Sequence, residues 1–355
     1  MDGYAVNSFD LRRVNRGEVR LKISGELGPG SSKSMRIERG ETIRVSTGTR
    51  IPDGADAVIP AEEVRVEAGR IVSTSTIRPG EFVYPIGADF RKGELLLRGN
   101  HKIRAQDVGL LLSLGIETVN VSKIPTVAVL ATGSELFDVG NPSAGKVLNT
   151  HGPLIANMVR AFGCTPLEVG VTPDDKRKLA GRIRRALKHA DLVITLGGTS
   201  VGRLDLITEV VRSFKPEVLY HGLRIDRGRV AGVAVLHRKP LLMLPGPIQG
   251  AMNAFVLVGI PILDKLRGGG GSTIKVRAML TANWDARSRF RNFTKVVYVR
   301  LEEDAGLKAE PLTGDTESIT ILTKATGYVV VPEHVTRLNT GDFVEVNLTP
   351  GFSYV

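Results

Sequence analysis

The strongest constraint on the fold is an alternation of apolar runs and amphipathic segments that begins at Pro125. The four apolar runs are 126–131, 167–171, 191–196 and 241–244, and the helical segments that follow them are 151–162, 174–190, 205–213 and 249–266. Strands that alternate with helices form a parallel sheet with helices on both faces. The carboxyl ends of its strands lie at one edge, where such sheets bind ligands. We therefore predict a parallel α/β domain over 124–267.

The sequence on either side of this domain has a different pattern. Residues 1–88 are short β-like runs between Gly, Pro and Asp turns, which predicts a β domain. Residues 89–123 form a small mixed segment, and a glycine linker at 268–272 precedes an all-β region at 273–355. Expected elements are a helix over 104–114 and strands over 116–121, 275–280, 295–301, 327–331 and 342–347. The fold class is thus multidomain α/β plus β.

Composition excludes several classes of protein. A chain of 355 residues with 42% apolar content is long enough for several cores and is not disordered. The sequence contains no run of 18 apolar residues and begins without a signal-like region, so we expect a cytoplasmic protein with no membrane span. The single cysteine, Cys164, excludes an intrachain disulfide and favours a packing role. Few glutamines and one cysteine indicate a thermophilic source.

The net charge of +11 is compatible with binding to nucleic acid, to a phosphorylated small molecule, or to neither. Residues 284–300 interleave aromatic and basic side chains, a pattern that also occurs on surfaces that stack nucleic-acid bases. A β-strand with one core face and one basic face explains the same pattern through its period of two. We favour the strand and expect no nucleic-acid partner.

Polar or glycine-rich loops follow all four predicted strands, at 131–136, 172–175, 197–202 and 245–247. The 197–202 loop (GGTSVG) is able to cradle a phosphate, because glycines let the backbone approach and N–H groups before a helix attract anions. Thr199 and Ser200 add hydroxyl donors. An ordinary tight turn explains the two glycines equally well.

Three carboxylates on these loops favour a functional interpretation. Glu135, Asp174 and Asp205 follow neighbouring strands, and carboxylates beside a phosphate site indicate a divalent cation such as Mg²⁺. The alternative is that Asp174 and Asp205 are helix N-caps or first-turn acids. Asn149 or Thr150 is the expected N-cap of the 151–162 helix.

Five motifs in order carry a resemblance to a known family. They are 1–5 (MDGYA), Thr47-Gly48 with 51–58 (IPDGADAV), 131–136 (ATGSEL), 197–202 with Asp205, and 244–247 (LPGP). Together they resemble the molybdopterin molybdenumtransferases, the molybdenum insertases to which the gephyrin E domain is related. The resemblance covers essentially the whole chain, and the ordered set is specific although each motif alone is not.

The resemblance implies an L-shaped homodimer whose subunits carry a β domain, a small mixed domain, a molybdopterin-binding α/β domain and a C-terminal β-barrel. Members of the family take adenylylated molybdopterin and molybdate or tungstate, hydrolyse the adenylate and insert the metal into the dithiolene. A divalent cation, here Mg²⁺, assists. A protein that adenylylates the pterin is an implied partner.

Motif matching also implies the site. The catalytic set is Asp2, Thr47, Asp89, Glu135 and Asp174, of which Glu135 and Asp174 are the implied metal ligands. The implied cofactor-binding residues are Thr132, Gly133, Gly197, Gly198, Thr199, Ser200, Gly202, Asp205, Arg229, Pro245 and Gly246. Asp205 is the expected pterin contact.

The sequence departs from the family pattern at several places. Residues 149–151 (NTH) stand where the family often has Asp-Ser/Thr-Asn, 247–250 (PIQG) replace Asn-Pro-Val-Ser, and Asp89 lacks a preceding Glu. Residues 225–229 (IDRGR) stand at the usual Lys-Pro-Gly-Lys-Pro, so Asp226 reverses one charge and Arg229 keeps the other as a planar fork. The chain also begins at the first motif, which suggests a shortened N-terminus. These departures leave open a divergent paralog that binds a pterin or nucleotide without full catalysis, and an interaction scaffold.

Overall fold

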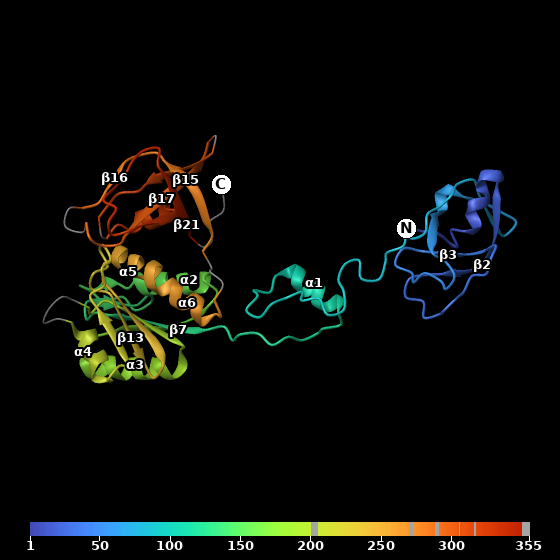
Figure 1. The fold of residues 1–355 in the computed structure, drawn as a ribbon. Helices are drawn as coiled ribbons and strands as arrows, with labels where there is room; N and C mark the ends of the chain where they lie inside the picture. The colour runs from blue at the N-terminus through green and yellow to red at the C-terminus, as the bar shows by residue number, and fades with distance from the viewer. Residues whose placement is uncertain (200–204, 270–272, 288–290, 305, 316, 350–355) are drawn as a thin grey trace. The chain divides into compact units, whose positions relative to one another are not determined.

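The computed structural model describes all residues except 200–204, 270–272, 288–290, 305, 316 and 350–355. The chain divides into two compact units, residues 1–98 and 99–355 (Figure 1). The described residues include only 268 and 269 of the predicted linker at 268–272. The predicted domain boundary at residue 88 stays a prediction. Of the described residues, none belongs to a helix that is long and apolar enough to cross a membrane.

The N-terminal unit is a six-stranded sheet in the order β4-β1-β3-β2-β6-β5. Its elements are β1 (Gly3–Val6), η1 (Asp10–Arg16), β2 (Val19–Leu27), β3 (Glu41–Val45), β4 (Ala57–Pro60), η2 (Ala61–Glu63), β5 (Arg65–Glu67) and β6 (Arg70–Ser73). Alternate residues of β1 enter two separate apolar clusters, with Tyr4 and Val6 in one and Ala5 in the other. The sheet is therefore covered on both faces, and the predicted β character of this region is confirmed.

The segment after this sheet contains one helix, α1 (Ala105–Ser113), as predicted. The predicted strand over 116–121 is wrong, because no described strand pairs with this run. Backbone N–H and C=O groups form a strand only when a neighbouring strand supplies their hydrogen bonds. The apolar residues of this run are exposed, Val121 by 70%.

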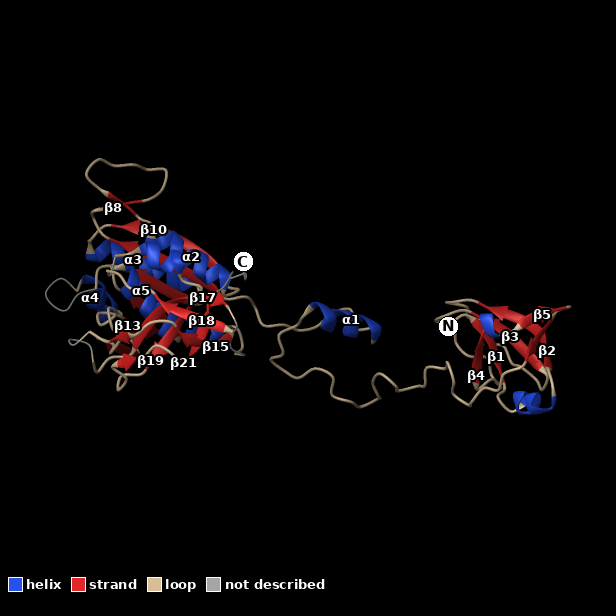
Figure 2. Ribbon diagram, turned by 90° about the horizontal axis from the view of Figure 1, so that it is seen from above, coloured by secondary structure: helices blue, strands red, loops and turns tan. Residues whose placement is uncertain are grey.

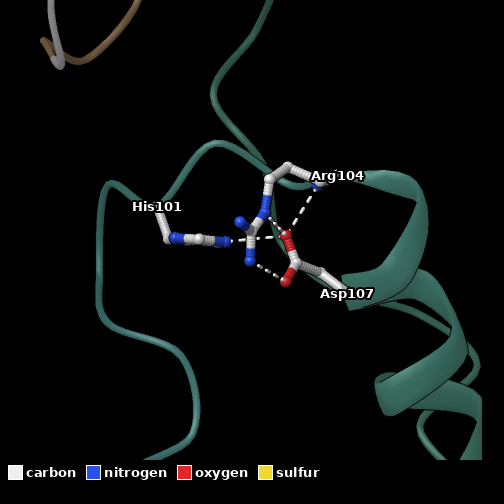
Figure 3. Close-up of polar contacts among 3 residues, drawn as sticks. All are labelled: His101, Arg104 and Asp107. Atoms are coloured by element: carbon white, nitrogen blue, oxygen red, sulfur yellow. Dashed lines mark hydrogen bonds and ion pairs between the residues drawn. The ribbon is translucent and has the colours of Figure 1, made fainter.

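Three side chains, those of His101, Arg104 and Asp107, form a hydrogen-bonded cluster at the N-terminus of α1 (Figure 3). The buried Asp107 carboxylate accepts hydrogen bonds from the Arg104 backbone N–H at 2.7 Å and from the Arg104 guanidinium at 3.0 Å. His101 Nε2 lies 2.7 Å from the same carboxylate. Bonds from Arg104, and then from His101, hold the pKa of Asp107 well below its usual range. The cluster caps the helix and ties the preceding loop to it.

The lowered pKa of Asp107 predicts a pH dependence. The carboxylate stabilises α1 fully above the ordinary aspartate pKa of about 4, and this contribution is lost as the pH falls through the lower folded-state value. We expect Asp107→Asn to reduce the hydrogen-exchange protection of α1 amides at neutral pH, with the difference from wild type shrinking toward about pH 2. Exchange mass spectrometry checks this result, and equal protection at neutral pH would contradict it.

The central sheet of the second unit has the strand order β10-β7-β11-β14-β13-β12. The predicted parallel strands are confirmed as β7 (Thr126–Thr132), β10 (Thr165–Thr172), β11 (Leu192–Leu196) and β14 (Lys239–Leu244). An antiparallel edge formed by β12 (Val218–His221) and β13 (Gly232–Leu236) was not predicted. Because β12 is short and only partly buried, its sequence carries little apolar contrast. A two-stranded pair, β8 (Leu136–Phe137) and β9 (Val147–Leu148), lies outside this sheet.

Helices cover both faces of the central sheet, as predicted (Figure 1). They are α2 (His151–Ala161), α3 (Lys176–His189), α4 (Leu206–Ser213), α5 (Ile248–Ala254), the π-helical turn η3 (Phe255–Gly259) and α6 (Ile260–Leu266). Residues of α2, α5, η3 and α6 share one core with the sheet, and those of α3 and α4 share the other. The Asn149 side chain accepts from the Gly152 N–H at 3.0 Å and so caps α2. Cys164 is buried in the first core, which confirms its packing role.

The C-terminal region contains a closed barrel in the order β15-β18-β17-β19-β21 (Figure 2). Its elements are β15 (Lys275–Leu280), β17 (Lys295–Glu303), β18 (Leu307–Pro311), α7 (Ile319–Lys324), β19 (Gly327–Val331) and β21 (Phe343–Leu348), beside the pair β16 (Trp284–Asp285) and β20 (Arg337–Leu338). The four predicted strands are confirmed. Tyr298 and Tyr328 of the barrel extend the α2/α5 core, and Tyr298 Oη donates to Asn253 Oδ1 at 3.0 Å.

The prediction of one alternating strand over 284–300 is wrong. Two short strand pieces, β16 and the start of β17, replace it, and described residues between them form no strand. Lys295, which that pattern placed on a solvated basic face, is only 1% exposed. Its ammonium donates to the carbonyls of Arg291, Glu333 and Val335 at 2.7–3.0 Å. These carbonyls replace the water that a buried cation loses.

Candidate functional site

A crevice of about 440 Å³ lies at the carboxyl edge of the central sheet. It is lined by residues after β7 and β11, by the loop before α5, by the start of α2, and by one residue that precedes α7. The lining residues of polar or glycine type are Thr132, Glu135, Asn149, Thr150, His151, Gly197, Gly198, Thr199, Gly246 and Glu317. Three of the four predicted loops therefore meet in one cavity.

The glycines of the 197–202 loop allow two backbone segments to approach closely. Gly197 and Gly198 have φ values of +80° and +65°, which side chains rarely tolerate. A Cβ on Gly197 would lie 2.6 Å from the Thr132 carbonyl oxygen. The turn thus requires glycine for steric reasons. Its role in holding a phosphate stays a prediction, and Ser200 and Gly202 lie outside the described residues.

Two of the threonines that line the crevice have a buried hydroxyl without a hydrogen-bond partner among the described residues. Oγ1 of Thr132 and Oγ1 of Thr199 are buried and make no hydrogen bond within the part of the chain that the structure describes. Thr132 is only 3% exposed, yet it lines the crevice. A buried hydroxyl without a partner costs about 1–3 kcal/mol. A water or a ligand group that reached either hydroxyl would remove this cost.

The loop carboxylates have different environments. Asp174 Oδ2 accepts from the Ser134 N–H at 2.9 Å, and its own N–H donates to Ser134 Oγ at 3.0 Å, which joins the loops after β7 and β10. Asp205 caps α4 by accepting from the Thr208 N–H at 3.2 Å, and its other oxygen lies 3.3 Å from His221 Nε2. The capping interpretation is thus confirmed for Asp205. For Asp174 it is wrong, because Asp175 caps α3.

The expected metal site is not a protein-only cage. Among the described residues, no three His, Cys, Asp or Glu side chains are grouped so that they could hold a metal ion. Glu135, Asp174 and Asp205 therefore form no such group, and only Glu135 of these three lines the crevice. Mg²⁺ commonly keeps several waters and uses one or two carboxylates together with substrate phosphates. The carboxylates present here fit only this arrangement, in which substrate phosphates and waters supply most of the ligands of Mg²⁺.

In the N-terminal unit the structure brings together two predicted residues that are 45 positions apart. Asp2 Oδ1 accepts from the Thr47 N–H at 2.7 Å and from Thr47 Oγ1 at 3.0 Å. These bonds lower the pKa of Asp2. Asp89 is exposed in a loop, and no described contact joins it to either residue.

Of the remaining predicted residues that the structure describes, Gly246 lines the crevice, and Gly133, Pro245 and Arg229 do not. Gly133 packs against the Glu135 side chain, whose carboxylate would lie 2.5 Å from a Cβ at this position. Pro245 is buried at the end of β14, and Arg229 is exposed in the loop between β12 and β13. The sequence prediction did not include Asn149, His151 and Glu317, of which the first two lie in the noted 149–151 departure.

A second cavity of about 380 Å³ lies between the β12–β13 loop and the barrel, and Asp226, Arg227 and Arg287 are among its lining residues. Asp226 is 8% exposed, and its Oδ1 has no hydrogen-bond partner among the described residues. Burial raises the pKa of this carboxyl, while the neighbouring Arg227 and Arg287 oppose the shift. The carboxyl group of Asp226, which stands where the family usually has a lysine, is therefore buried.

The structure is a multidomain α/β fold with a crevice at the carboxyl edge of its central sheet, the edge at which sheets of this class bind ligands. Three family models match the chain: "MoeA N-terminal region (domain I and II)" over 1–115, "Probable molybdopterin binding domain" over 128–265, and "MoeA C-terminal region (domain IV)" over 277–349. The chain belongs to the molybdopterin molybdenumtransferase family, and it acts in molybdenum cofactor biosynthesis.

Relatives and solved structures support this membership over nearly the full chain. The molybdopterin molybdenumtransferase of Staphylococcus aureus is 31% identical over 340 residues, which are 93% of this chain and 74% of the relative. That of Bacillus subtilis is 28% identical over 98% of this chain and 82% of the relative. The crystal structure of a molybdopterin biosynthesis MoeA protein from Pyrococcus horikoshii matches with a TM-score of 0.86, at 31% identity over 99% of this chain and 87% of that one.

Proposed function

We propose that this enzyme hydrolyses the adenylate of adenylylated molybdopterin and inserts molybdate or tungstate into the released dithiolene. The observation that carries the proposal is the crevice at the sheet edge, which is lined by Gly197 and Gly198 and by two threonines, Thr132 and Thr199, whose hydroxyls have no partner among the described residues. Such donors suit a phosphoanhydride, because phosphoryl transfer depends on positioning and on stabilising charge on phosphate oxygens.

The chain's own groups would act by binding and orienting. Backbone N–H groups of residues 197–199 and the two threonine hydroxyls would donate to phosphate oxygens while water attacks phosphorus and the bridging P–O bond breaks. Asp205 would contact the pterin. Asp205 also caps α4 and lies beside His221. Both roles are compatible, because a carboxylate has more lone pairs than these two contacts use. Arg229, which is exposed in the β12–β13 loop, would bind the oxyanion.

Mg²⁺ would enter with the substrate phosphates, and Glu135, which lines the crevice, would be its protein ligand, with Asp174 on the adjoining loop. When bound, the ion would neutralise phosphate charge.

A homodimer and a pterin-adenylating partner protein complete the proposal. Asp2, Thr47 and Asp89 belong to the N-terminal unit and the remaining predicted residues to the second unit, so two sets of residues must be combined. In a symmetric dimer, the set of one subunit is able to serve the crevice of the other.

A divergent paralog that binds without full catalysis is the second candidate. The buried Asp226, at a position where the family usually has lysine, favours it, because a carboxylate there weakens attraction for an oxyanion.

The deciding experiment mixes purified protein with adenylylated molybdopterin, Mg²⁺ and molybdate or tungstate, and follows AMP release. Release that depends on the oxyanion supports the insertase, and omission of Mg²⁺ is expected to slow it. Tight binding of the pterin without release would instead support the paralog. Light scattering on the same preparation is expected to give the mass of two chains, and an active monomer would contradict the dimer.

A further inference from the structure

His151 lies where α2 begins, and it contacts the loop that precedes α5. Its Nδ1 is 3.1 Å from the Gly246 carbonyl oxygen. Because a carbonyl oxygen only accepts hydrogen bonds, Nδ1 must carry the proton of this contact. Nε2 makes no hydrogen bond to any residue that the structure describes. The ring is therefore fixed through one nitrogen and keeps the other for a further partner.

Nε2 of His151 belongs to the one side chain of basic type among the described residues that line the crevice. The ionisable side chains among the described lining residues are Glu135, Glu317 and His151, with no lysine or arginine. The chain as a whole carries a net charge of +11, yet none of the lysines and arginines that the structure describes lines the crevice. An anionic ligand in the crevice thus meets two carboxylates and one side chain that is able to become positive.

Two other observations favour an anion near the N-terminus of α2. Thr132 lines the same cavity, and its buried hydroxyl has no hydrogen-bond partner among the described residues. The 11-residue helix α2 begins here, and the partial positive charge of a helix N-terminus favours anions. Both features are independent of the histidine.

We propose that Nε2 of His151 binds a phosphate group of the ligand and does so most strongly when the imidazole is charged. The inference rests on the proposed function, in which the crevice holds a phosphoanhydride. Its consequence is that affinity rises as the pH falls through the range in which histidines gain charge. Glu135 and Glu317 are the other titratable side chains among the described lining residues, and the Gly246–Pro247 segment that His151 contacts carries none.

The test is calorimetric titration of the full chain with adenylylated molybdopterin at about pH 6 and about pH 8, at constant Mg²⁺. Both phosphates of this ligand are anhydride diesters, so their charge stays constant over this range. We expect wild type to bind about tenfold more tightly at the lower pH, the size of one charge-assisted hydrogen bond. His151→Asn should bind weakly at both values, and His151→Lys, which keeps its charge, should bind tightly at both. His189→Asn, at an exposed position in the last turn of α3, is the matched control and should behave as wild type.

The outcomes separate the two proposals. No binding by wild type would overturn the proposed function. Binding by wild type whose pH dependence survives in His151→Asn would overturn the role of His151 and leave the proposed function standing. Thermal melts of each variant accompany the titration, and the lysine variant tests the inference independently if the asparagine variant unfolds.

Discussion

Gly197→Ala is expected to abolish ligand binding at the crevice and to destabilise the fold by about 3 kcal/mol. The residue has φ +80°, and a Cβ would lie 2.6 Å from the Thr132 carbonyl oxygen. Gly197 follows β11 and Thr132 ends β7, which are adjacent in the sheet, so neither backbone is free to retreat. The contact therefore strains the backbone at Gly197 and should shift Gly198 and Thr199, which line the crevice. Urea unfolding and titration with adenylylated molybdopterin measure the two effects.

The matched control is Gly181→Ala in α3, where nothing lies within 4 Å of an added Cβ. This helical site should gain about 0.5–1 kcal/mol, since alanine restricts the unfolded chain and favours the helix. Wild-type affinity and stability in Gly197→Ala would show that the loop accommodates a side chain, and would contradict the steric requirement. The control should bind the ligand as wild type does.

Phe255→Ala is expected to cost about 3–5 kcal/mol of unfolding free energy, the range for removing a fully buried aromatic ring. Phe255 is 0% exposed, and its ring packs edge-on against Phe162 with centroids 6.3 Å apart. It belongs to the core that also holds Tyr298 and Tyr328 of the barrel. The cavity left by the substitution should therefore weaken the contact between the α/β domain and the barrel as well as each part.

Denaturant unfolding followed by circular dichroism measures this loss. Tyr220→Ala is the control, because Tyr220 is an aromatic residue of the same unit that is 68% exposed on β12. Exposed side chains away from special contacts usually change stability by no more than about 0.5 kcal/mol. Equal losses in the two variants would contradict the assignment of Phe255 to a shared core. A separate early transition for the barrel in Phe255→Ala would support the shared core.

Local sequence patterns predicted those features that depend on neighbours along the chain. The four parallel strands, the helices that cover them and the short helix α1 follow from hydrophobic periodicity and turn residues. The family could be recognised from the order of the loop motifs along the chain. The glycine pair at Gly197 and Gly198 belongs to one of these motifs, and its positive φ values demand glycine.

Features that depend on distant partners could not be predicted in this way. The 116–121 run has strand-like residues but no neighbouring strand, and Lys295 appears solvated in a periodic pattern yet is enclosed by carbonyl groups from two segments. The β12–β13 edge becomes regular only through pairing with β14.

For this protein, the sequence by itself determined the family, the parallel α/β core and the loops that carry its polar residues. Only the tertiary structure decided that Asn149, His151 and Glu317 share a crevice with Thr132 and Gly197, and that Asp205 caps a helix and lies beside His221. The physical reason is the range of the interactions. Periodicity and turn chemistry act over a few residues, whereas a crevice, a buried charge or an unpartnered hydroxyl arises from contacts between segments far apart in the chain.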